Sequence, residues 1–162
     1  PATKESQERL RGYRNALEIY GCPFLPELIR MGDYLFASGL RAMKELLTLP
    51  KRPTAVFATS DLMAIGALKA AEAHGVRIPE EMALVGFDDI EAAQWTSPTL
   101  TTVRQPLRQL GEIGGRAIVK AITGTSEQTM ISLGCTLVIR ESCGASGRRM
   151  VPTREIGEAP SG

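Results

Sequence analysis

The chain has 162 residues, enough for one domain with a hydrophobic core, and 43% of them are hydrophobic. Nineteen basic residues against 18 acidic ones leave a net charge of +1, so no basic excess points to nucleic acid or to a membrane surface. No segment has the length and apolarity of a transmembrane helix, and residues 1–7 lack the apolar run of a secretory signal. Three scattered cysteines form neither a disulfide framework nor a Cys-x-x-Cys motif, which predicts reduced thiols in a cytoplasmic protein.

Apolar spacing predicts two helices in the first 50 residues. Residues 6–20 are expected to form a helix that Gly21 ends, with an apolar stripe of Leu10, Tyr13, Leu17 and Tyr20. Residues 24–31, apolar and interrupted by prolines, predict a loop that leads into a short strand. Ser38 is expected to cap the second helix, whose buried stripe would consist of Leu40, Met43, Leu46 and Leu47.

A strand–helix–strand unit is predicted next. Residues 54–59 and 82–87 are short and almost continuously apolar, which is typical of parallel strands covered on both faces. Between them, Ser60 or Asp61 is expected to cap a helix that ends at Gly75 and buries Leu62, Ile65, Leu68 and Ala71. Together these segments predict a βαβ unit.

The remaining chain predicts an extended segment at residues 100–103, a helix at 107–122 that Gly124 ends, and a strand at 129–139. Beyond Cys143 the sequence turns to Gly, Ser, Pro and charged residues without periodicity. Residues 144–162 are therefore expected to be a disordered tail.

Polar residues follow both strands of the βαβ unit. Ser60 and Asp61 follow the first strand, and Asp88 and Asp89 follow the second. Open α/β sheets bind ligands at the carboxyl ends of their strands, where turns leave backbone N–H groups free. Position alone leaves two interpretations open: these side chains bind a ligand, or they cap a helix and shape a turn.

Catalysis has little support in the sequence. The only histidine, His74, lies near the end of a helix, far in sequence from both aspartates, and no nucleophile elbow, P-loop or zinc-protease motif occurs. Asp88 and Asp89 would have to converge to bind a metal or share a proton, and adjacent residues on one turn rarely do. We therefore expect no enzyme activity, no metal site and no cofactor.

Four blocks of sequence resemble the LacI/GalR family of bacterial transcription regulators. They lie at residues 53–68, 75–90, 97–106 and 137–142, in the family's order and spacing, and the likeness extends from residue 9 to residue 142. The resemblance implies an α/β, periplasmic-binding-protein-like type I fold of two lobes with a ligand cleft between them. Residues 1–143 would form the C-terminal lobe, in a parallel sheet flanked by helices.

The resemblance also implies what a longer protein would contain. The chain begins with Pro1 rather than Met, so we expect further sequence upstream. In the family, a helix-turn-helix domain that binds operator DNA and a first lobe precede this region. The first strand of the second lobe would also be missing, which should leave an exposed apolar edge on the sheet.

The family's ligand-binding positions carry over to five residues of this chain. Arg9 would grip ligand hydroxyls, Tyr34 would stack on the ligand, and Asp88 would accept hydrogen bonds from hydroxyls. Ser60 stands where many relatives have asparagine, and Gln105 would line the cleft. The alternatives stay open: an exposed helix arginine for Arg9, simple burial for Tyr34, and a plain crossover residue for Gln105.

The resemblance implies a homodimer formed through the second lobe, with Leu62, Ile65 and Trp95 at the interface. It implies that a small polar effector, a sugar or a nucleoside-like molecule, binds between the lobes and shifts the dimer between DNA-binding states. Operator DNA would be a partner only through the helix-turn-helix domain upstream. The alternative function is that of a periplasmic sugar-binding protein of a transport system, which shares the fold.

Overall fold

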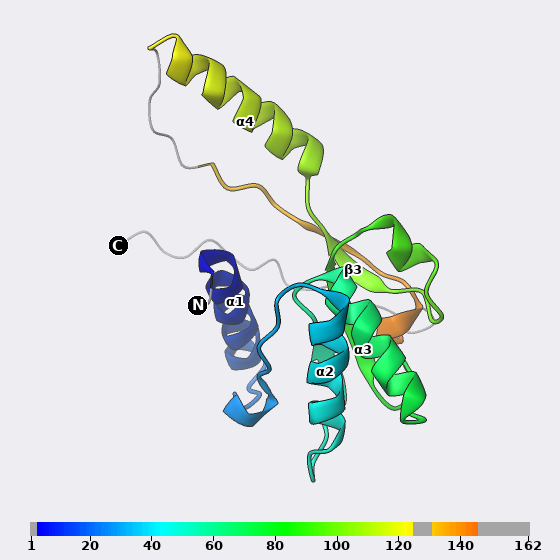
Figure 1. Ribbon diagram of the computed structural model, residues 1–162. Helices are drawn as coiled ribbons and strands as arrows, with labels where there is room; N and C mark the ends of the chain where they lie inside the picture. Colours follow the sequence, from blue (N-terminus) through cyan, green and yellow to red (C-terminus); the bar gives the residue numbers. More distant parts are fainter. Residues whose placement is uncertain (1–2, 125–130, 146–162) are drawn as a thin grey trace.

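A computed structural model describes residues 3–124 and 131–145 of the chain (Figure 1). Its centre is a four-stranded sheet in the order β1-β2-β3-β4, formed by Ala55–Phe57, Ala83–Asp88, Thr101–Arg104 and Thr136–Val138. The first three strands are parallel, and β4 is antiparallel to β3. The predicted α/β fold with a mainly parallel sheet flanked by helices is confirmed.

In the described part of the chain four α-helices accompany the sheet: α1 (Lys4–Ile19), α2 (Phe36–Leu47), α3 (Asp61–Ala73) and α4 (Leu107–Ile122). Three short 3-10 helices, η1 (Pro26–Leu28), η2 (Glu91–Gln94) and η3 (Glu141–Cys143), lie in the connections. The predicted stops at Gly21, Gly75 and Gly124 are confirmed, since each has a positive φ that other residues adopt at a cost.

The core lies between α2, α3 and the sheet. Glycines make the close approach of α2 to α3 possible, because a Cβ atom on Gly39 would collide with the backbone of Met63. A Cβ atom on Gly66 would collide in the same way with the Phe36 carbonyl. The α3 side chains that face this crossing are small or flexible: Met63, Ala64, Ala67, Ala70 and Ala71.

Three local predictions are wrong. Ser38 does not cap α2: the helix starts two residues earlier, and the buried Ser38 hydroxyl donates back to the Leu35 carbonyl at 2.9 Å. Leu62 is not buried but 43% exposed, whereas its neighbours Met63 and Ala64 on α3 are buried. Residues 24–31 form the expected loop, with the 3-10 helix η1 in it, but no strand follows it before α2 begins at Phe36.

The predicted strand at residues 129–139 is shorter than expected, since β4 covers only Thr136–Val138. Residues 129–130 lie outside the described residues. The predicted disordered tail, 144–162, lies outside them too except for its first two residues, so neither prediction is tested there.

Helix α4 stands away from the rest of the molecule (Figure 1). None of its residues is buried. Even its apolar side chains Leu107, Ile118 and Ile122 are at least 62% exposed. The chain reaches α4 through β3 and returns to the body through the segment that leads into β4.

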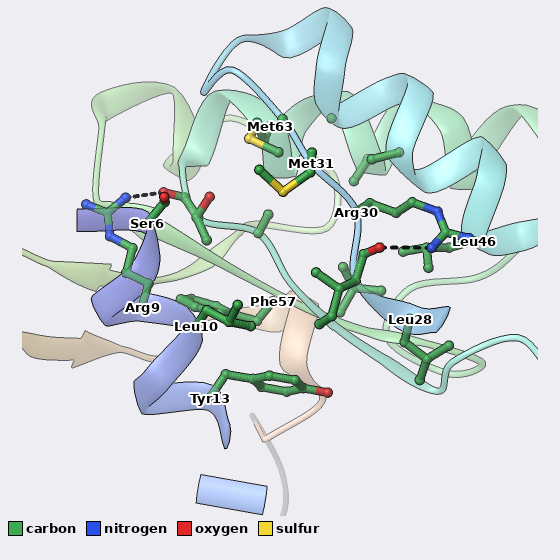
Figure 2. Close-up of a pocket in the computed structure, with 18 of the residues that line it drawn as sticks. Ser6, Arg9, Leu10, Tyr13, Leu28, Arg30, Met31, Leu46, Phe57 and Met63 are labelled. Atoms are coloured by element: carbon green, nitrogen blue, oxygen red, sulfur yellow. Dashed lines mark hydrogen bonds between the residues drawn. The ribbon is translucent and has the colours of Figure 1, made fainter. Parts of the chain in front are cut away.

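The apolar edge expected on the sheet is present. Among the described residues β1 is an edge strand, and its Ala55 and Phe57 side chains are exposed. A cavity of about 270 Å³ lies along this edge, between α1 on one side and α2 on the other (Figure 2). Its lining is mostly apolar and includes Leu10, Tyr13, Leu28, Met43 and Phe57.

Candidate functional site

A second pocket of about 470 Å³ lies at the carboxyl ends of β1 and β2. Six of its eight lining residues have polar or charged side chains, and it is here called the polar pocket. Four of the five predicted ligand residues line it, namely Arg9, Tyr34, Ser60 and Asp88. They come from α1, from the loop before α2, from the start of α3 and from the end of β2. Residues up to 79 positions apart in sequence therefore meet where an open α/β sheet binds its ligands.

Asp88 is the acceptor in this pocket. It ends β2 with a φ of 118°, a backbone conformation that β-strands do not continue, so the chain turns at the pocket wall. The Gln105 amide donates to Asp88 Oδ1 at 2.8 Å, which brings the fifth predicted residue to the site through Asp88. Burial raises the pKa of Asp88 above its usual range and outweighs Gln105 and the nearby Arg9, which both lower it.

Arg9 is the main donor. One end of its guanidinium donates to the Thr59 carbonyl at 2.7 Å, which ties α1 to the end of β1. The guanidinium also lies over the Phe87 ring, 4.0 Å from its centroid, and 5.7 Å from the centroid of Tyr34. The two rings and the carbonyl fix its plane, and its other N–H groups remain available to a ligand.

The Ser60 side chain is linked to the Tyr34 backbone by a hydrogen bond. Tyr34 has a φ of 67°, an unusual conformation for a residue with a side chain, and the Ser60 hydroxyl donates to its carbonyl at 3.0 Å. The same hydroxyl accepts from Met63 N, so Ser60 is also the predicted N-cap of α3. Its single donor is used in this way, and Ser60 keeps only an acceptor for a ligand.

Sequence reasoning missed one supporting residue, Phe87, and left the role of another, Asp61, open. Phe87 supports the Arg9 guanidinium, and its position next to Asp88 in a strand gave no signal beyond apolarity. Asp61 is fully buried, and it accepts from Thr102 Oγ1 at 2.6 Å and from Ile90 N at 2.9 Å. It therefore holds the loop after Asp88 in place rather than lining the pocket.

The chemistry of the pocket is that of a binder. A carboxylate, a guanidinium and an aromatic ring face one volume, which suits a ligand with neighbouring hydroxyl groups and an apolar face. Within residues 3–124 and 131–145, no group of three His, Cys, Asp or Glu side chains could hold a metal ion. Nor does any helix in these ranges have the length and apolarity to cross a membrane.

The three residues predicted for a dimer interface differ in exposure. Trp95 is 72% exposed after η2, and Leu62 is 43% exposed at the start of α3, where it also borders the polar pocket. Ile65 is only partly buried and packs against the core. All three lie on or close to α3 and η2.

Comparison with known proteins agrees with the fold. The periplasmic binding protein-like domain family matches residues 1–143. The HTH-type transcriptional regulator CelR of Thermobifida fusca is 43% identical over 136 residues, which are 83% of this chain and 40% of CelR. The HTH-type transcriptional repressor CytR of Escherichia coli K12 is 40% identical over 135 residues, again 83% of this chain and 40% of the relative.

Solved structures give the same result. A complex of the transcriptional regulator CelR with cellobiose superposes with a TM-score of 0.80 at 41% identity, covering 85% of this chain and 42% of that one. A transcriptional regulator of the LacI family from Sanguibacter keddieii gives a TM-score of 0.82 at 32% identity, covering 89% and 54%. The chain thus spans about 40% of the length of the curated relatives it matches. The predicted resemblance is confirmed, and the chain belongs to the periplasmic binding protein-like domain family, in the form found in LacI-family transcription regulators.

Proposed function

We propose that the chain is the effector-sensing and dimer-forming part of a LacI-type transcription regulator, and that its effector is a sugar. The observation that carries this proposal is the meeting of Arg9, Tyr34 and Asp88 in one polar pocket. A fixed guanidinium and a carboxylate that line one pocket bind the acceptors and donors of vicinal hydroxyls, and an aromatic ring packs on the apolar face of a pyranose.

Roles follow from the contacts of each side chain. Arg9 donates to ligand oxygens, and Asp88 accepts from ligand hydroxyls through Oδ2, since Oδ1 already accepts from Gln105. Tyr34 packs on the ligand. Ser60 acts mainly by holding the Tyr34 backbone, because its hydroxyl donates to the Tyr34 carbonyl.

Cellobiose is the first effector to test, since a CelR–cellobiose complex is among the similar structures. The similar proteins are named as regulators and repressors, which favours regulation in the cytoplasm over the alternative of sugar transport and over enzyme activity. Effector binding would shift a homodimer between its DNA-binding states, with DNA contacts made by a helix-turn-helix domain outside this chain.

The test replaces one pocket carboxylate in the complete regulator. Asp88→Asn should abolish the release of operator DNA by cellobiose, or by the active sugar in a panel of mono- and disaccharides. DNA binding without sugar should stay unchanged. Fluorescence anisotropy of labelled operator DNA measures both.

Glu72→Gln is the matched control, because it also removes one negative charge, from a 71% exposed side chain of α3 outside the pocket. It should respond to sugar as the unmodified regulator does. A normal sugar response in Asp88→Asn would contradict the assigned role of this carboxylate.

A further inference from the structure

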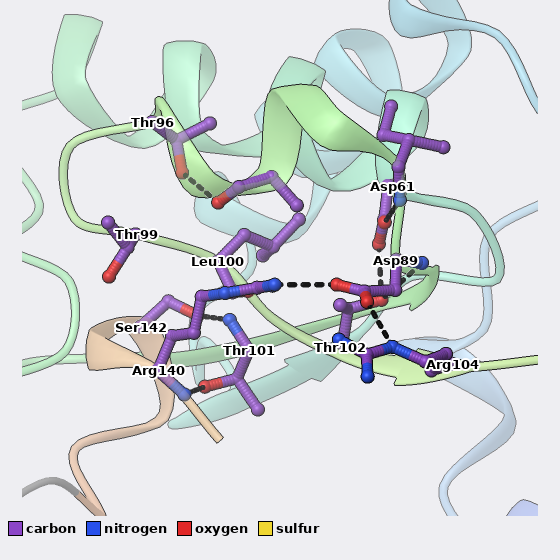
Figure 3. A network of polar contacts seen from close by, with 12 residues as sticks. Asp61, Asp89, Thr96, Thr99, Leu100, Thr101, Thr102, Arg104, Arg140 and Ser142 are labelled. Atoms are coloured by element: carbon purple, nitrogen blue, oxygen red, sulfur yellow. Dashed lines mark hydrogen bonds and ion pairs between the residues drawn. The ribbon is translucent and has the colours of Figure 1, made fainter. Parts of the chain in front are cut away.

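Asp89, the residue after the proposed effector ligand Asp88, lies at the centre of a different set of contacts (Figure 3). Its Oδ2 accepts from Arg104 Nε at 2.5 Å, and its Oδ1 accepts from Arg140 Nη2 at 2.6 Å. Its side chain is only 6% exposed. Two cations on one nearly buried carboxylate make a rigid cross-link, here called the Asp89 clamp, of Asp89, Arg104 and Arg140.

The clamp joins two segments that are distant in sequence. Arg104 is the last residue of β3, two residues before α4 is capped, and Arg140 follows β4. Arg104 lies where the chain leaves β3 for α4, and Arg140 lies beyond β4, after the chain has returned from α4 (Figure 1). Arg140 is itself fixed from β3, since it donates to the Leu100 carbonyl at 2.7 Å and its backbone N–H donates to Thr101 Oγ1 at 2.9 Å.

The clamp and the pocket share the same two dipeptides. Asp88 pairs with Arg104 in the register of β2 and β3, and Gln105 donates to Asp88 while Arg104 donates to Asp89. Both aspartates have positive φ values, 118° and 56°, so the turn directs one carboxylate into the pocket and the other into the clamp. A displacement of Asp88 therefore moves Asp89 and the start of the α4 connection with it.

We infer that Asp89 is a positioning residue of the proposed effector site: through Arg104 and Arg140 it fixes Asp88 and Gln105 for the sugar and couples sugar binding to the ends of β3 and β4, between which the chain forms α4. The inference rests on the proposed function and adds the route by which the pocket acts on the rest of the regulator. Asp89 itself does not touch the sugar.

The decisive variant is Arg104→Gln in the complete regulator. The Arg104 side chain is 57% exposed, so its loss removes one arm of the clamp and leaves the buried Asp89–Arg140 pair and the fold in place. Sugar binding, measured by calorimetric titration with cellobiose or the active sugar of the panel, should weaken by roughly fivefold or more. The melting temperature without sugar should change little, which separates positioning from general destabilisation.

Arg108→Gln is the matched control. Arg108 is 92% exposed and also holds one carboxylate, Glu112, but it lies on α4 away from the clamp. It should bind sugar as the unmodified regulator does, and Arg104→Lys, which keeps the charge and one donor, should restore part of the lost affinity. Asp89→Asn should weaken both sugar binding and sugar-induced DNA release by at least as much as Arg104→Gln.

The outcomes separate the two proposals. If Asp88→Asn loses the sugar response while Arg104→Gln and Asp89→Asn bind sugar and release DNA like Arg108→Gln, the inference is overturned and the proposed function stands. If the unmodified regulator ignores every sugar of the panel, the proposed function fails and the inference fails with it. Should Asp89→Asn not fold, the comparison of Arg104→Gln with Arg108→Gln still decides.

Discussion

The neighbouring carboxylates Asp88 and Asp89 both follow β2 with positive φ values, but their pKa values are shifted in opposite directions. Burial dominates for Asp88 and raises its pKa. Burial also opposes the charge of Asp89, but the hydrogen bonds and charges of Arg140 and Arg104 together prevail and lower its pKa. Asp88 therefore gains a proton at a higher pH than an ordinary aspartate does, and Asp89 keeps its negative charge to a lower pH.

The raised pKa of Asp88 predicts that sugar binding depends on pH. A carboxylate whose pKa lies above its ordinary value of 3.8 gains a proton at a higher pH than usual, and the protonated group accepts fewer hydrogen bonds from hydroxyls. The affinity for sugar should therefore fall as the pH is lowered from about 7 towards the pKa of Asp88, above the ordinary range for aspartate. Titrations over a pH series would measure it.

Glu72→Gln should follow the same pH profile, because Glu72 lies outside the pocket. A regulator that holds its affinity unchanged down to the pH at which an ordinary aspartate protonates would refute a role for ionised Asp88.

At the scale of elements, the crossing of α2 and α3 determines the core. Gly39 and Gly66 bring the two backbones together, and the alanines of α3 fill the narrow space between them. Ser60 is the N-cap of α3, and its hydroxyl donates to the Tyr34 carbonyl in the loop before α2. The packing of these two helices therefore also positions one wall of the polar pocket.

Gly66→Ala should lower the free energy of unfolding by about 1–3 kcal/mol, because the added methyl group meets the Phe36 carbonyl and forces the helices apart. Gly12→Ala is the control: Gly12 lies within α1 and has no atom within 4 Å of an added Cβ, so alanine should stabilise the helix by up to about 1 kcal/mol. Urea unfolding followed by circular dichroism measures both. Equal effects of the two substitutions would show that the crossing is looser than described.

The same crossing explains what could not be predicted from sequence. The period of large apolar residues correctly predicted α2 and its Met43 and Leu46, since both are buried in a stripe that helix geometry defines. On α3 it selected Leu62, which is exposed, because a close contact buries alanines that carry almost no periodic signal. The spacing of large apolar residues predicts that a helix forms, but the element packed against the helix determines which of its sides is buried.

The site shows the same division. The positions of Ser60 and Asp88 at strand ends were visible in the sequence, because strands and their ends follow from apolar runs and the residues after them. The contact of Arg9 with Phe87 and the pairing of Asp89 with Arg140, 51 residues away, depend on tertiary packing. No local spacing predicts them.

At the scale of the molecule, exposed apolar surface has a definite distribution. Besides the β1 edge, it includes α4, where Leu107 and Ile122 are 65% and 79% exposed, and Trp95 after η2 with Leu62 at the start of α3. Surfaces of this kind mark contacts with other protein surfaces. The proposed dimer uses the surface of Trp95 and Leu62.

Leu62→Glu should weaken that dimer, because a carboxylate would be desolvated at a contact that an apolar side chain makes favourable. Since Leu62 also borders the pocket, the mass of the regulator should be measured without sugar, by sedimentation equilibrium over a range of concentrations. Arg41→Glu, a larger change in charge (two units rather than one) at an exposed position of α2, should leave the mass unchanged. An undiminished dimer in Leu62→Glu would place the interface elsewhere.

The open edge of β1 has a practical consequence for work with this 162-residue chain alone. A strand with a free edge can hydrogen-bond through its N–H and C=O groups to another extended backbone. The exposed Phe57 adds an apolar side chain that favours such contacts. Concentrated samples of the isolated chain should therefore tend towards edge-to-edge association and aggregation. Screening of expression and crystallisation conditions is better started at low concentration, with light scattering as the criterion for a usable preparation.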